Sequence, residues 1–393
     1  MRPRNGLPLL TEPPAPILIN HLAPPRTGST AVAMQIWARA KEVRSVIHEP
    51  SAHRGLWGVG WSSVEARIRA ATEAHRPELG RAAYFTKQIS FHVGTVTEGP
   101  RWARRCAHHV LSVRNPLYAI ESYLLAIGSL AQPRPLARAS LATLDSHAID
   151  AFVQAGLYCV RDPEWRQEHW RAGRGGAAPS LSFRARHLNH PWNTLPLRLR
   201  ESVDLGVRLG WSKLGQHAAH LQSLQRRVVV VDFTPLRFVN GGSIDPLLSL
   251  LRLTPLAEWR DTPIDLGDWK RRPEVDAFFS GTIGRQEVSP PKRRPLPVEG
   301  LPPSIHAQVQ TALDIHVRLV RAAARTGTLF PDLSTVRHLL PRMARVDPVS
   351  SHVYQQLLVE RGDSVPRLPS TARSYLRDYP KTVAMLDNAL GRP

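Results

Sequence analysis

Short apolar runs alternate with amphipathic stretches along the first two thirds of the chain. Apolar runs bounded by polar or turn-forming residues predict buried strands, and they occur at residues 15–23, 43–48, 82–90, 108–113 and 227–233. Helical periodicity predicts helices at residues 31–41, 63–75, 116–130, 143–160 and 200–225. Strands that alternate with helices form a mainly parallel sheet covered on both faces. The sequence therefore predicts an α/β fold, a three-layer sandwich around a central sheet.

The chain is expected to have three parts. The N-terminal part is rich in proline, which predicts a loose tail. The last begins with proline and basic residues up to Pro303, continues with an amphipathic helix at Ile305–Ala324 and then reads as a small helical appendage. We expect the parts to be a tail over residues 1–14, an α/β domain over residues 15–285 and a C-terminal extension over residues 286–393.

Composition limits the class of protein. The 393 residues include 52 basic and 32 acidic side chains, which gives a net charge of +20. No apolar run approaches the ~18 residues that a membrane span needs, the start lacks a signal-peptide core, and Cys106 and Cys159 are the only cysteines. We expect a cytoplasmic protein with no membrane partner. The positive charge fits a nucleic acid, a small polyanionic ligand or arginine-rich codon usage.

A turn at Pro24–Thr30 separates the first strand from the first helix, and its residues suit anion binding. Such a turn directs backbone N–H groups and the positive end of the helix dipole to one point. Gly28 would let the backbone approach a ligand, Arg26 adds charge, and hydroxyl donors come from Thr27, Ser29 and Thr30. A nucleoside triphosphate loop of the form GxxxxGK[ST] needs a lysine that this turn lacks. An ordinary capped helix start is the simpler alternative.

The turn reads PRTGST, and a second motif follows the fourth predicted strand. There, Arg114-Asn115-Pro116 is followed by Ser122-Tyr123, with Ser122 eight residues after Arg114. Together these motifs resemble the sulfotransferases that use 3'-phosphoadenosine 5'-phosphosulfate (PAPS). The resemblance implies that PRTGST holds the 5'-phosphosulfate and that Arg114 and Ser122 hold the 3'-phosphate. It covers roughly residues 15–285.

The same resemblance implies a basic loop that closes on the 3'-phosphate. The usual RKG sequence is absent, and two segments could replace it. One contains Trp269, Lys270 and Arg271, and the other is Lys292–Arg294.

The resemblance also suggests catalytic residues for sulfuryl transfer from PAPS to a hydroxyl or amine. The reaction depends on position and charge, with a base near the acceptor and cations near the leaving oxygen. Lys87 and Arg26 would contact the sulfuryl or bridging oxygens. His92 is the first candidate base, although it lies further from Lys87 than in the best-known members. The reserve candidates for the base are His48, Glu49 and His21.

Two other classes of function remain open. The basic, aromatic and glycine-rich insertion Trp165–Trp192 predicts a lid or substrate loop, but it also fits a nucleic-acid-binding surface loosely. A P-loop kinase with Arg26 in place of lysine is the other alternative. Under the preferred interpretation we expect a small-molecule acceptor, such as an aromatic secondary metabolite, with no nucleic acid and no metal.

Overall fold

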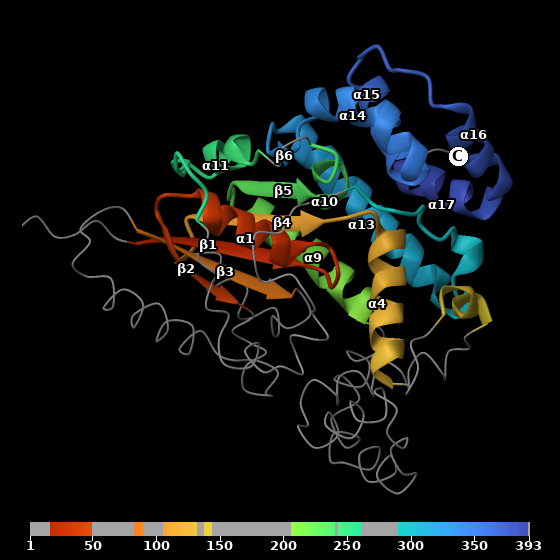
Figure 1. Cartoon of the computed structure of the whole chain (residues 1–393), viewed down its shortest axis with the longest axis horizontal. Helices are drawn as coiled ribbons and strands as arrows, with labels where there is room; N and C mark the ends of the chain where they lie inside the picture. Colours follow the sequence, from red (N-terminus) through yellow and green to blue (C-terminus); the bar gives the residue numbers. More distant parts are fainter. Residues whose placement is uncertain are drawn as a thin grey trace, which may run out of the picture.

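The sheet contains six parallel strands in the order β2-β3-β1-β4-β5-β6 (Figure 1). The computed structural model describes residues 16–48, 82–89, 105–131, 137–143, 206–239, 243–260 and 290–391. Within these ranges the strands are β1 (Ile17–Ala23), β2 (Val43–His48), β3 (Ala83–Ile89), β4 (His108–Val113), β5 (Val228–Asp232) and β6 (Leu329–Phe330). The prediction of an α/β fold with a central parallel sheet is confirmed.

Helices cover both faces of the sheet. On one face lie α1 (Ser29–Arg39) and α11 (Asp245–Leu250), and on the other lie α4 (Pro116–Ala131), α9 (Gly206–Ser223) and α13 (His306–Arg325). Alternate residues of β5 enter different cores, because Val229 and Val231 pack with α1 whereas Val230 packs with the α9 and α13 side. Apolar residues on both faces explain why the strands read as continuous apolar runs.

Successive strands are added to the sheet first on one side of β1 and then, from β4 onward, on its other side. From β1 the chain runs outward to β2, and from β4 it runs to β5 and β6 on the other side. Strands β1 and β4 are paired in parallel, with Leu22 opposite Leu111, so the two loops that follow these strands are neighbours. Ligands of open α/β sheets bind beyond the carboxyl ends of the strands at such a point.

The C-terminal extension contributes a strand to the sheet as well as helices around it. Strand β6 pairs with β5, and α13 packs against α9 and β5. Beyond β6 the chain forms α14 (Leu333–Val346), α15 (Pro348–Glu360), α16 (Ser370–Asp378) and α17 (Pro380–Leu390). The sequence did not predict β6, because two residues are too few to show a period. No helix in the described ranges is long and apolar enough to cross a membrane.

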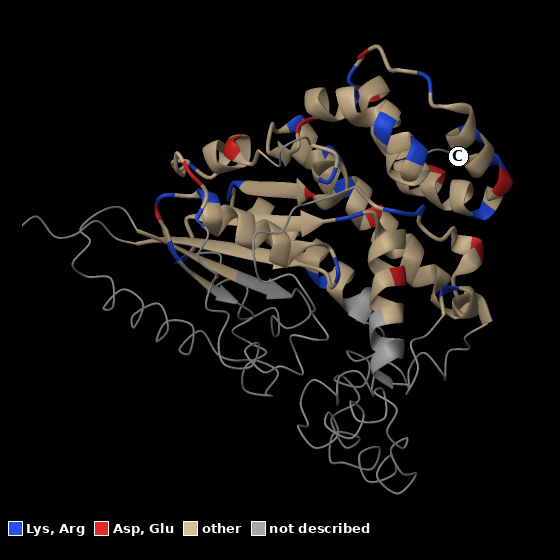
Figure 2. Ribbon diagram, viewed as in Figure 1, with Lys and Arg blue, Asp and Glu red and all other residues tan. Residues whose placement is uncertain are grey.

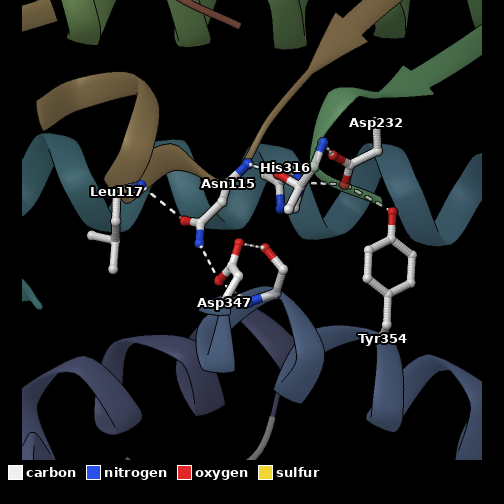
Figure 3. Close-up of polar contacts among 8 residues, drawn as sticks. Asn115, Leu117, Asp232, His316, Asp347 and Tyr354 are labelled. Carbon is white, nitrogen blue, oxygen red and sulfur yellow. Dashed lines mark hydrogen bonds and ion pairs between the residues drawn. The ribbon is translucent and has the colours of Figure 1, made fainter. Parts of the chain in front are cut away.

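A buried carboxylate at the end of β5 joins the sheet to the C-terminal helices (Figure 3). Asp232 accepts hydrogen bonds from His316 Nε2 at 2.9 Å and from Tyr354 Oη at 2.8 Å. It also accepts from the Thr234 backbone N–H at 2.8 Å, which caps the short helix α10 (Phe233–Leu236). All three side chains that form the first two bonds are buried. A single carboxylate therefore connects β5, α10, α13 and α15 by hydrogen bonds.

We expect Asp232→Ala to lower the free energy of unfolding by about 3 kcal/mol, because it leaves buried donors without an acceptor. Asp245→Ala is the control, since the Asp245 side chain is 37% exposed and pairs with Arg39 near the surface. Its cost should stay below about 1 kcal/mol. Chemical denaturation measures both values, and equal losses would contradict the assigned role of Asp232.

Candidate anion-binding site

The loop after β1 has a left-handed backbone at two positions. Arg26 has φ 64° and Gly28 has φ 78°. Thr27 is fully buried, and its Oγ1 donates to the Pro24 carbonyl at 2.8 Å, so this hydroxyl stabilises the turn itself. The first bond of α1 runs from Val32 N to the Gly28 carbonyl at 3.1 Å. The N–H groups of the first turn of α1 therefore lie where a helix start binds anions.

Gly28 also lies directly against the ring of Phe233, the residue that follows β5. A Cβ atom at position 28 would be 2.4 Å from this ring. Glycine is thus required both by the positive φ and by the space. The contact fixes the distance between the loop after β1 and the end of β5.

The two sequence motifs meet beyond the carboxyl ends of β1 and β4. Arg26 Nε donates to Ser122 Oγ at 3.1 Å, and Arg114 Nη1 donates to the Arg26 carbonyl at 3.3 Å. Arg114 follows β4 directly, and Ser122 lies in the second turn of α4. Residues almost a hundred positions apart in sequence are therefore in direct contact, as the sequence motifs require if they bind one ligand.

Arg237 is a third cation at this site, and sequence reasoning missed it. Its guanidinium lies 5.9 Å from the centre of the Phe233 ring, and that of Arg114 lies 6.0 Å from the same centre. Arg114 also stacks on Tyr118, at 5.0 Å. Burial, followed by repulsion from Arg237 and a smaller effect of Arg26, lowers the pKa of Arg114 to about 10. Arg114 stays charged at neutral pH, so a bound anion would offset the repulsion among these cations.

The side chains of this loop differ in how far solvent can reach them. The side chain of Ser29 is buried, Thr30 is half-buried, and Arg26 is exposed. Arg26 is therefore the side chain of PRTGST that is most accessible to a ligand, while the backbone supplies the other donors.

Three of the proposed catalytic residues lie in one row across the sheet. Lys87 on β3 is in register with His21 on β1 and with His48 on β2. The His21 side chain is fully buried, bonded through Nε2 to Ser112 Oγ at 2.6 Å and packed edge-on against Phe85. His21 in this position has no access to an acceptor molecule. The first candidate base, His92, and its reserve Glu49 lie outside the described residues.

One of the two basic segments lies against α4. Arg293 Nη2 pairs with Glu121 at 3.0 Å, and the Arg293 carbonyl accepts from Tyr118 Oη at 2.6 Å. Glu121 directly precedes Ser122, and Tyr118 lies under Arg114. Segment Lys292–Arg294 is therefore close to the cation cluster formed by Arg26, Arg114 and Arg237. Trp269, Lys270 and Arg271 lie outside the described residues, as does the insertion Trp165–Trp192.

Within the described part of the chain, lysine and arginine residues are distributed over many elements, with acidic residues among them (Figure 2). In the described ranges, no group of three or more His, Cys, Asp or Glu side chains is arranged to hold a metal ion.

No family model matches the chain, and no curated protein or solved structure matches it significantly.

We expect Gly28→Ala to lower the free energy of unfolding by about 3 kcal/mol, since it adds a clash with Phe233 to the strain of a left-handed alanine. Gly327→Ala is the matched control, because Gly327 has φ 66° and nothing within 4 Å of an added Cβ. It should cost about 1 kcal/mol. If denaturation gives the same loss for both variants, the contact between Gly28 and Phe233 does not constrain the loop.

Proposed function

We propose that the protein is a PAPS-dependent sulfotransferase that acts on a hydroxyl or amine of a small molecule. One observation carries the proposal, namely the contact of Arg26 with both Ser122 and Arg114 at the ends of β1 and β4. Two motifs that resemble the two phosphate-binding segments of one family are brought to one point by the parallel pairing of their strands.

The chemistry of the cation cluster fits a ligand with several negative charges. Arg26, Arg114 and Arg237 supply guanidinium groups, which bind phosphate and sulfate oxygens through paired N–H donors. Ser122 adds a hydroxyl, and the first turn of α1 adds backbone N–H groups. When bound, PAPS would supply the sulfuryl group. The protein would hold the phosphates and offset the charge that develops on the leaving oxygen.

Proton removal from the acceptor would fall to a base near the ends of β2 and β3. The row that contains Lys87 and His48 supports this location, since both residues lie near the carboxyl ends of their strands, on the same side of β1. A histidine has a pKa suited to the role. His92 and Glu49 follow these two strands closely in sequence, so they remain candidates beside His48.

A kinase-like phosphotransferase is the alternative, and the loop itself argues against it. Position 29, directly after Gly28, is a buried serine where the nucleoside triphosphate loop has its lysine. The arginine of this loop lies before the glycine instead.

Calorimetry with adenosine 3',5'-bisphosphate is the direct test. We expect micromolar binding, or about −8 kcal/mol, and at least tenfold weaker binding for Arg114→Ala because charge-assisted bonds to phosphate are lost. Arg377→Ala is the control, since that side chain is 78% exposed and lies on α16. The absence of binding to the unmodified protein would refute the proposal, and a requirement for Mg²⁺ and ATP would favour the kinase alternative.

A second measurement identifies the base, using labelled PAPS and a panel of phenolic, alcoholic and amine acceptors. We expect His92→Ala to reduce turnover at least a hundredfold while bisphosphate affinity stays within about twofold, since general-base catalysis contributes on the order of 10²-fold or more. His48→Ala is measured in parallel. Full turnover by His92→Ala would exclude His92 as the base, and a loss by His48→Ala alone would assign the role to His48.

A further inference from the structure

Asn115 lies between Arg114 and α4, and hydrogen bonds hold it on three sides (Figure 3). Its backbone N–H donates to Thr234 Oγ1 at 2.9 Å. Its side-chain Oδ1 accepts from Leu117 N at 3.0 Å, which caps the start of α4. Its Nδ2 donates to Asp347 Oδ1 at 2.9 Å. Because the side chain is 1% exposed, water cannot readily replace these partners.

Asp347 comes from the turn between α14 and α15, more than two hundred residues further along the chain. It caps α15, where it accepts from the Ser350 backbone N–H at 3.0 Å and from Ser350 Oγ at 2.8 Å. The Asn115 and Ser350 groups all act as donors to this carboxylate, which is the arrangement that an ionised acceptor needs. Burial raises the pKa of Asp347, whereas the bonds from Ser350 and Asn115 act in the opposite direction.

The same turn contacts α4 at a second point. Tyr118 Oη approaches the Val346 carbonyl at 3.3 Å, and the Tyr118 ring supports the guanidinium of Arg114. Residues 346–347 therefore contact the residue that follows Arg114 and the ring on which Arg114 stacks. The helical extension thus contacts two residues next to Arg114 at the end of β4.

We propose that Asp347 is a positioning residue of the anion site, which holds Arg114 in place through its hydrogen bond from Asn115. Asp347 is fully buried, so it would act through Asn115 rather than on the ligand itself. The effect on nucleotide binding rests on the proposed function, whereas the effect on the position of Arg114 does not. The C-terminal helices are then part of the binding apparatus, and residues 15–285 would not form a complete site.

Three variants separate the hydrogen bond from the charge and from general stability. Asp347→Ala removes the acceptor. Asp347→Asn keeps an oxygen for Asn115 and the Ser350 N–H, and its amide can donate to the Ser350 hydroxyl, so geometry is kept without the charge. Thr382→Val is the matched control, because Thr382 is buried in the same extension and its hydroxyl bonds Val298 and Glu299 rather than Asn115 or Asp347.

Binding of adenosine 3',5'-bisphosphate is measured by calorimetry for each full-length variant. We expect about tenfold weaker binding for Asp347→Ala and affinity within about twofold of the unmodified protein for Asp347→Asn and Thr382→Val. Unchanged affinity in Asp347→Ala would overturn the proposal. An equal loss in Asp347→Asn would also overturn it, because charge rather than the hydrogen bond would then be responsible.

Two further measurements cover the other outcomes. If Asp347→Ala does not fold, Asn115→Ala removes the same bond, and its unchanged affinity would overturn the proposal. If the unmodified protein binds no bisphosphate, the proposed function fails, and the crystal structure of Asp347→Ala or Asn115→Ala decides the positioning role. Arg114 still bonded to the Arg26 carbonyl and stacked on Tyr118 would overturn it, whereas a displaced Arg114 would support it.

Discussion

The candidate site depends on the buried carboxylate of Asp232. It fixes the start of α10, and the next residue, Phe233, contacts Gly28 and lies under both Arg114 and Arg237. The Asp232 carboxylate also accepts from His316 and Tyr354, and all three residues are buried from water. A buried acceptor that serves three donors has little freedom to move, because any shift would leave a polar group without a partner. The position of Phe233, beneath Arg114 and Arg237, is therefore fixed by the hydrogen bonds of its neighbour Asp232.

Most of the fold could be predicted from local patterns. The five longer strands appear as apolar runs, and α1, α4, α9 and α13 appear as periodic segments, because each buries its own apolar residues. The helix expected at residues 63–75, and all but the first residue of the helix expected at residues 143–160, lie outside the described residues. Strand β6 was not predictable, since Leu329 and Phe330 acquire their role only by pairing with β5. The fold class is confirmed, whereas the assignment to the sulfotransferases remains a proposal.

The site was predictable only where a motif marks it. Arg26, Gly28, Arg114 and Ser122 stand in recognisable local patterns, and the structure brings them together. Arg237 and Asp347 belong to no recognisable sequence motif. Their positions depend on contacts with distant segments, and one arginine among 52 basic residues cannot be distinguished by composition. The net charge of +20 is likewise much larger than a cluster of three arginines requires.

The hydrogen bonds of Asn115 to Asp347 and of Asp232 to Tyr354 have a consequence for the order of folding during synthesis. The loop after β1 and the strands around it leave the ribosome long before residues 347 and 354, which form these bonds. Domains that fold during translation form their contacts as the chain emerges, from the N-terminus onward. In this protein the hydrogen bonds at the carboxyl end of β5 are not complete until residue 354 has emerged. These contacts are therefore completed late, and a nascent chain that has completed only the first five strands still lacks them.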